Sequence, residues 1–394
     1  MGRAFVSRVV SELPSSGIRR FFDLIDGSDG VISLGVGEPD YITPEVIRSA
    51  CIEALKKGVT KYTSNCGMAE LRNEISNYLA ARFGLTYAPD QILVTTGVSE
   101  AVDLALRAII NPGDEILIPE PCYVSYSPCT AIAGGVPVMV PTRYEDEFRL
   151  KKEVLISYIT DKSKAILLSF PNNPTGAIMT SEDLKEIAEV AEKYDLLIIS
   201  DEVYAELTYE TRHVSIASLP GMADRTIVLN GFSKAFSMTG WRLGFAAGPK
   251  DIINAMLKIH QYTMLCAPSF SQYAAITALR EGSRFVEEMV DDYNKRRKLI
   301  VTGLNQIGLP CLEPKGAFYA FPSIKHTGMT SEEFCERLFF EEKVAVVPGN
   351  AFGKSGEGFV RCCYAASYKE IEEALERIER FLKRHCHQKN AAVR

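Results

Sequence analysis

The sequence predicts an α/β fold in which helices cover both faces of a mainly parallel sheet, followed by a smaller α+β unit. Short apolar runs without a polar face alternate with helical patterns along most of the chain. After Gly308 the pattern changes to short strand-like segments and one closing helix. The 394 residues are enough for one large domain and a smaller one.

Local patterns place the individual elements. A short helix and loop are expected at 11–29, and residues 31–40 are expected to form a strand that runs into a Gly/Pro turn. Thr43 is expected to cap a helix that Gly58 ends. Further strands are expected at 91–96, 115–119, 164–170, 196–200 and 225–229, and helices at 68–83, 101–110, from 181, at 249–279 and at 284–304.

The smaller unit is expected to contain strands at 316–321, 344–348 and 358–364 and a helix at 369–384. We expect three divisions of the chain. Residues 1–45 form an N-terminal segment that joins the small domain, residues 46–290 form the large domain, and residues 291–394 form the small C-terminal domain.

Composition excludes several classes of protein. A net charge of −6 provides no basic surface for nucleic acid, and no apolar stretch reaches the ~18 residues of a membrane span. The first residues lack the long apolar core of a secretion signal. Ten irregularly spaced cysteines in so long a chain indicate reduced thiols and a cytoplasmic protein. The His-Cys-His run at 385–387 has no second ligand pair, so no metal site is expected.

Polar side chains follow four of the predicted strands. Ser99 comes after a strand and a glycine, at a helix start whose free N–H groups suit a phosphate, although a simply capped helix has the same pattern. Asn173 follows the strand at 164–170, and Asp201 with Tyr204 follows the strand at 196–200. Lys234 and Arg242 follow the strand at 225–229 in a loop rich in Gly, Ser and Thr. Open α/β sheets bind ligands at this end of their strands.

This set of side chains matches the needs of pyridoxal phosphate. The cofactor requires a lysine for its aldehyde, an acid for its pyridine nitrogen, donors for its phenolic oxygen, and cations with N–H groups for its phosphate. An acid close to the ring nitrogen keeps that nitrogen protonated, because an opposite charge favours the charged form. The protonated ring then accepts electrons from the substrate's α-carbon.

With these residues in view, the sequence resembles the class I and II aminotransferases of fold type I over nearly its whole length. The resemblance rests on the Asn-Asn-Pro-Thr-Gly run at 172–176, the Ser-Asp-Glu-Val-Tyr run at 200–204, the segment 233–242, the segment 34–40 and the region of Arg361. It implies a large cofactor-binding domain with a mainly parallel seven-stranded sheet flanked by helices, and a smaller α+β domain.

The resemblance also implies roles for residues around the cofactor ring. Lys234 would form an imine with the cofactor and move the proton of the substrate's α-carbon. Asp201 would pair with the pyridine nitrogen, and Asn173 and Tyr204 would bond the phenolic oxygen. Tyr123 would stack on the ring. Lys234, Asp201 and Tyr204 are thus the expected catalytic residues.

Further roles concern the phosphate and the substrate. The resemblance implies that Arg242, Ser233 and the turn at Val98 and Ser99 hold the phosphate. Tyr62 resembles a tyrosine that reaches the phosphate from the neighbouring subunit, which implies a homodimer with shared active sites. Arg361 would bind the substrate α-carboxylate in a bidentate pair, with the Gly37 backbone and Asn173 beside it.

Several reactions remain open on this scaffold. The preferred interpretation is ping-pong transfer of an amino group from an aromatic or dicarboxylic L-amino acid to a 2-oxo acid, with glutamate and 2-oxoglutarate as one pair. The alternatives are an N-acetyl-LL-diaminopimelate aminotransferase and a carbon–sulfur β-lyase. Ser99 stands where aspartate-specific relatives often carry a lysine, which weakens the case for a strict aspartate enzyme. Regulators with this fold carry a DNA-binding unit for which the residues before Val31 leave no room.

Overall fold

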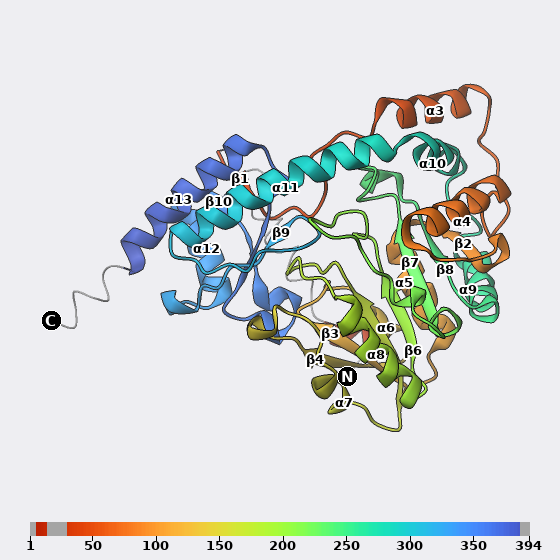
Figure 1. Ribbon diagram of the computed structural model, residues 1–394, viewed down its shortest axis with the longest axis horizontal. Helices are drawn as coiled ribbons and strands as arrows, with labels where there is room; N and C mark the ends of the chain where they lie inside the picture. The colour runs from red at the N-terminus through yellow and green to blue at the C-terminus, as the bar shows by residue number, and fades with distance from the viewer. Residues whose placement is uncertain (1–4, 14–29, 387–394) are drawn as a thin grey trace.

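The large sheet organises the molecule. The computed structural model describes residues 5–13 and 30–386 (Figure 1). Within these residues the sheet has seven strands, in the spatial order β2-β8-β7-β6-β5-β3-β4. They are β2 (Ile92–Thr95), β3 (Glu115–Glu120), β4 (Val136–Pro141), β5 (Ser163–Ser169), β6 (Leu197–Asp201), β7 (Thr226–Gly231) and β8 (Gly244–Ala247). Only β8 is antiparallel to its neighbours, β2 and β7, so the expected mainly parallel seven-stranded sheet is confirmed.

Helices cover both faces of this sheet, which is why most residues of its strands are apolar. All residues of β2, β7 and β8 are buried. One apolar cluster packs the sheet against α5 (Gly97–Ile109), α6 (Tyr126–Ile132) and α9 (Lys250–Thr263). The clusters on the opposite face involve α3 (Glu45–Lys56), α4 (Ala69–Phe83), α7 (Lys152–Ile156), α8 (Ser181–Lys193) and α10 (Ser269–Glu281).

The smaller unit lies beside the sheet and contains short strands under long helices (Figure 1). Its strands are β1 (Ile32–Ser33), β9 (Tyr319–Ala320), β10 (Val344–Ala345), β11 (Val347–Pro348) and β12 (Val360–Cys363). Its helices are α11 (Ser283–Gln306), α12 (Ser331–Glu342) and α13 (Tyr368–Cys386). β1 pairs with β10 in parallel, so the strand before α3 belongs to this unit. The sheet β11-β12-β9 is antiparallel.

Several elements differ from the sequence prediction. The pattern at 249–279 gave one helical region, whereas α9 and α10 are separate helices. β4 and β8 were not predicted. Thr43 does not cap α3, because its hydroxyl donates to the carbonyl of Ser237 at 2.6 Å. Most of the helix and loop expected at 11–29 lies outside the described residues. The expected division between residues 290 and 291 falls inside α11 and stays a prediction.

Two further observations concern the whole described chain. Among the helices of residues 5–13 and 30–386, none has the length and hydropathy needed to cross a membrane. The same residues include no group of three metal-ligating side chains, and His387 of the tail run lies outside them.

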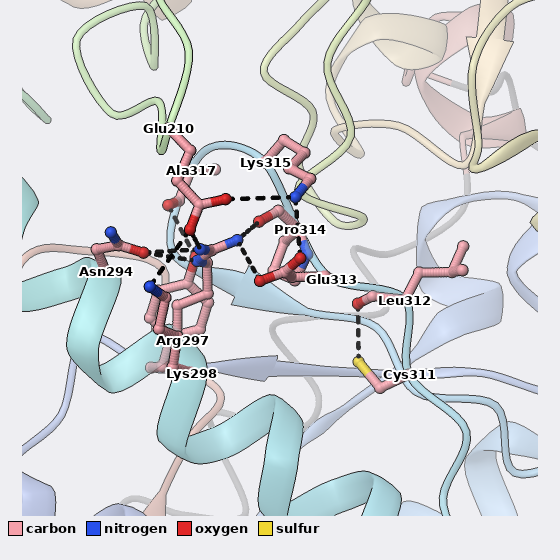
Figure 2. A network of polar contacts seen from close by, with 11 residues as sticks. Glu210, Asn294, Arg297, Lys298, Cys311, Leu312, Glu313, Pro314, Lys315 and Ala317 are labelled. Carbon is pink, nitrogen blue, oxygen red and sulfur yellow. Dashed lines mark hydrogen bonds and ion pairs between the residues drawn. The ribbon is translucent and has the colours of Figure 1, made fainter.

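A buried arginine connects the two units (Figure 2). The side chain of Arg297, on α11, has no exposed surface and donates to the carbonyl of Pro314 at 2.9 Å and to Glu210 at 2.9 Å. It also pairs with Glu313 at 3.0 Å, and its guanidinium lies 5.0 Å from the ring centre of Tyr209. The chain after β6 is thereby fixed to α11 and to the segment that leads into β9.

We expect Arg297→Ala to lower the free energy of unfolding by about 2–4 kcal/mol, because it empties a buried side-chain site and leaves the buried carbonyl of Pro314 without its donor. Urea unfolding measures this loss. Lys298→Ala is the matched control: this neighbouring lysine side chain is 58% exposed and makes one 3.3 Å pair with Glu210, so its loss should cost less than about 1 kcal/mol. Equal losses in the two variants would contradict the structural role of Arg297.

Candidate active site

The strand ends gather the predicted side chains at one edge of the large sheet. β5, β6 and β7 run parallel, so Asn173, Asp201 and Lys234 follow strands that end at the same edge. β2 is antiparallel to β8, which is antiparallel to β7, so β2 also ends there and delivers the start of α5. This edge is where ligands bind in open α/β sheets.

Asp201 is a buried carboxylate at the end of β6, with 5% of its surface exposed. The hydroxyl of Tyr126 donates to its Oδ2 at 2.8 Å, and the backbone N–H of Val203 donates to its Oδ1 at 3.2 Å. Burial raises the pKa of Asp201 from 3.8 to about 6, against the lowering effect of these two hydrogen bonds. The carboxylate is therefore held rigidly and is charged at neutral pH, where a cationic partner would stabilise it.

Lys234 is a partly buried amine beside the loop that follows β1. Its Nζ donates to the carbonyl of Gly37 at 2.7 Å and lies 5.8 Å from the ring centres of Tyr204 and Phe318. Burial lowers the pKa of Lys234 from 10.5 to about 8. The neutral amine is the nucleophilic and proton-accepting form, and it forms at a lower pH here than in an exposed lysine.

Arg361 is a buried guanidinium, with 2% of its surface exposed. It donates to Oδ1 of Asn173 at 2.9 Å and to the carbonyl of Gly35 at 2.5 Å. Its Nε has no hydrogen-bond partner, and none of the described carboxylates forms an ion pair with it. A buried cation without a carboxylate partner is costly, so the arrangement suits a carboxylate brought by a ligand.

Tyr319 contacts Tyr204, Gly37 and the Arg361 guanidinium. The hydroxyls of Tyr204 and Tyr319 are 2.7 Å apart. A side chain on Gly37 would place its Cβ 2.7 Å from the Tyr319 hydroxyl, so only glycine fits at this position. The ring centre of Tyr319 lies 4.5 Å from the Arg361 guanidinium.

The start of α5 and Arg242 lie directly against each other. A Cβ on Gly97 would lie 2.6 Å from Nη2 of Arg242, so the guanidinium rests directly on the helix start. Val98 and Ser99 belong to the first turn of α5, with Val98 buried and Ser99 exposed. The exposed Arg242 has φ +52°, and its Nη1 donates to the carbonyl of Thr239 at 3.0 Å. Helix N–H groups beside a cation favour a phosphate.

The remaining predicted residues have different surroundings. Ser233 is buried in the loop that leads to Lys234. The ring of Tyr123 is partly buried and meets Tyr126 edge-on at 5.6 Å. Tyr62 is 82% exposed and none of the other candidate side chains contacts it within this chain. All the candidates except Tyr62 thus belong to the strand-end edge or to the adjoining face of the small unit.

Sequence reasoning missed Tyr126 and Tyr319. The partner of Tyr126, Asp201, is 75 residues away, and the partner of Tyr319, Tyr204, is 115 residues away. The segment at 316–321 was expected to be a strand, but nothing in its pattern distinguishes a tyrosine that faces a site from one that packs in a core.

The buried charge of Asp201 leads to a stability prediction. The folded pKa lies above the unfolded one, so the wild type loses stability as the pH rises through about 6. We expect Asp201→Asn to remove this loss. Without added ligand the variant should be more stable by about 3 kcal/mol at pH 8, with the gain vanishing near pH 4.

Urea unfolding at several pH values measures this gain. Asp195→Asn serves as the control, because the side chain of Asp195 is 96% exposed and should give no comparable pH-dependent gain. A gain for Asp201→Asn that does not change with pH would contradict the raised pKa.

Comparison with known proteins identifies the family. The family model of aminotransferase class I and II matches residues 29–378. YugH of Bacillus subtilis (strain 168) is 54% identical over 380 residues, which are 96% of this chain and 98% of YugH. The aspartate aminotransferase of Pyrococcus abyssi (strain GE5 / Orsay) is 50% identical over 93% of this chain and 96% of its own.

Solved structures agree with these relatives. The aromatic aminotransferase from Pyrococcus horikoshii OT3 has a TM-score of 0.89 at 50% identity, with 93% of this chain and 99% of that chain covered. The resemblance inferred from the motifs is confirmed, and this chain belongs to the class I and II aminotransferases, enzymes that transfer amino groups between amino acids and 2-oxo acids.

Proposed function

We propose that this aminotransferase uses pyridoxal 5′-phosphate and works by a ping-pong mechanism. The observation that carries the proposal is the combination, at one edge, of the Lys234 amine with a lowered pKa and the Arg361 guanidinium without a carboxylate partner. An amine that is readily neutral can bond to an aldehyde, and an unpaired buried cation can bind the carboxylate common to all amino acids.

The residues present fit the cofactor. Asp201 would face its pyridine nitrogen, Asn173 and Tyr204 its phenolic oxygen, and Tyr123 its ring. Arg242, Ser233 and the N–H groups at Val98 and Ser99 would hold its phosphate. The close approach of Arg242 to Gly97 supports this assignment, because a side chain at residue 97 would fill the turn. When bound, the cofactor supplies a carbonyl for imine formation and a cationic ring that accepts electrons.

The chain's own residues would then divide the work. Lys234 moves a proton to and from the substrate's α-carbon, and its pKa of about 8 matches a proton carrier at neutral pH. Asp201, charged above about pH 6, stabilises positive charge on the ring nitrogen. Arg361 with Asn173 fixes the α-carboxylate, which orients the reacting carbon.

The substrates we propose are aromatic or dicarboxylic L-amino acids, with glutamate and 2-oxoglutarate as one pair. Relatives named for aspartate and for aromatic amino acids at 50% identity support this pair of classes. Ser99 adds no cation for a second carboxylate. N-acetyl-LL-diaminopimelate is a second candidate, because a relative named for that reaction is 42% identical over 94% of this chain. A carbon–sulfur β-lyase activity would share the cofactor residues and release pyruvate.

We further propose a homodimer in which Tyr62 contributes to the partner's phosphate site. Two observations support this. Tyr62 is 82% exposed, and Tyr262 nearby in the fold is 91% exposed. The side chain of Asn65 donates to the carbonyl of Leu265 at 2.7 Å, so the loop that carries Tyr62 lies against the segment that follows α9, the helix that carries Tyr262. The cytoplasmic location expected from the cysteine content stays a prediction.

A panel of amino donors with 2-oxoglutarate tests the proposed reaction. We expect glutamate to form with aromatic or dicarboxylic donors, without release of pyruvate or sulfide. Arg361→Lys should lower kcat/KM by roughly 10- to 100-fold for every donor, because one forked charged contact is lost. The donors serve as controls for one another. Pyruvate or sulfide as the main product would show that the enzyme catalyses β-elimination and not amino transfer. A decrease in kcat/KM confined to one donor would show that Arg361 contacts a substrate side chain and not the α-carboxylate.

A further inference from the structure

Tyr319 occupies the junction between the two units of the protein. It lies in β9, is completely buried, and stands opposite Cys363 in the register of β9 with β12. Side chains two residues apart in a strand share a face, so Arg361 and Cys363 project to the same side as Tyr319. The tyrosine thus extends from the small unit toward the edge of the large sheet.

Three site groups meet at this one side chain. Its hydroxyl is 2.7 Å from the hydroxyl of Tyr204. The same hydroxyl leaves no space for a side chain on Gly37, whose carbonyl accepts the Lys234 hydrogen bond. Its ring stacks against the Arg361 guanidinium at 4.5 Å. Tyr319 therefore contacts Gly37, which holds the Lys234 amine, and also contacts Tyr204 and Arg361.

The segment before Tyr319 is fixed by its own contacts. The carbonyl of Ala317 accepts hydrogen bonds from the hydroxyls of Tyr209 and, at 3.1 Å, of Tyr364. The carbonyl of Pro314 accepts the Arg297 bond in the network of Figure 2. The pairing of β9 with β12 and the packing of the Tyr319 ring against Tyr204, Phe318 and Arg361 then hold its hydroxyl beside Tyr204.

We propose that Tyr319 is a positioning residue that sets the hydrogen-bond donor strength of Tyr204. The inference rests on the proposed function, in which Tyr204 donates to the phenolic oxygen of the bound cofactor. A phenol has a single hydrogen. While Tyr204 donates that hydrogen to the cofactor, its oxygen accepts one from Tyr319. Hydrogen bonds in such a chain polarise and strengthen one another.

The donor strength of Tyr204 affects the proton that the cofactor's phenolic oxygen shares with the neighbouring nitrogen when the cofactor is bound. A stronger donor at the phenolic oxygen stabilises its anion, which favours loss of the shared proton and lowers the pH at which the visible absorption changes. Without the Tyr319 hydroxyl the donor is weaker. The midpoint of that absorption change should therefore move to higher pH.

The experiment is a pH titration of the visible absorption of the cofactor-loaded enzyme. We expect Tyr319→Phe, which keeps the ring on Arg361, to raise the midpoint by about 0.5–1 pH unit. Tyr87→Phe is the matched control. It removes a buried hydroxyl that has no hydrogen-bond partner within the described residues and lies in another apolar cluster, so its midpoint should stay within about 0.2 unit of the wild type.

A second pair of variants separates a role through Tyr204 from a structural one. In a Tyr204→Phe background, Tyr319→Phe should produce no further shift, because the chain of hydrogen bonds is already broken. Additive shifts, or equal midpoints for Tyr319→Phe and the wild type, would overturn this inference alone. A wild-type enzyme without any titrating visible band would overturn the proposed function and the inference with it.

Discussion

The burial of one carboxylate underlies the whole arrangement. Asp201 ends a strand whose first three residues are apolar, and its carboxylate meets Tyr126 of the covering helix α6. Burial raises its pKa to about 6, and Tyr126 with the N–H of Val203 holds it in one orientation. A protein gains no stability from such a group alone. A cationic ligand beside Asp201 would offset the free energy that burial of this carboxylate costs.

The rest of the site depends on how the small unit meets the sheet edge. Arg361 and Tyr319 come from neighbouring antiparallel strands of that unit, whereas Asn173, Asp201 and Lys234 come from the ends of β5, β6 and β7. Gly37 lies between the two sets and contacts both. Any relative movement of the units would change the distance between the Arg361 guanidinium and the Lys234 amine. The buried Arg297 network fixes part of that junction (Figure 2).

The sequence was sufficient for the fold class and for predicting that the candidate residues after apolar runs lie at one edge of the sheet. Asp201 and Lys234 were chosen as candidates because a charged residue at the end of a buried strand is unusual. β8 was missed because its four apolar residues directly follow the loop of Arg242 and have no turn signal of their own. Thr43 has the pattern of a helix cap, but its hydroxyl donates to the carbonyl of Ser237, which is 194 residues away. Tyr126 and Tyr319 are defined by such distant partners, which no local pattern encodes.

The central claim is that the Lys234 amine bonds to the aldehyde of pyridoxal phosphate. The most direct measurement is borohydride reduction of the cofactor-loaded protein, followed by peptide mapping by mass spectrometry. The account predicts one added pyridoxyl phosphate group per chain, carried by the peptide that contains Lys234. Reduction that adds no such group, or attaches it to a different lysine, would contradict the account.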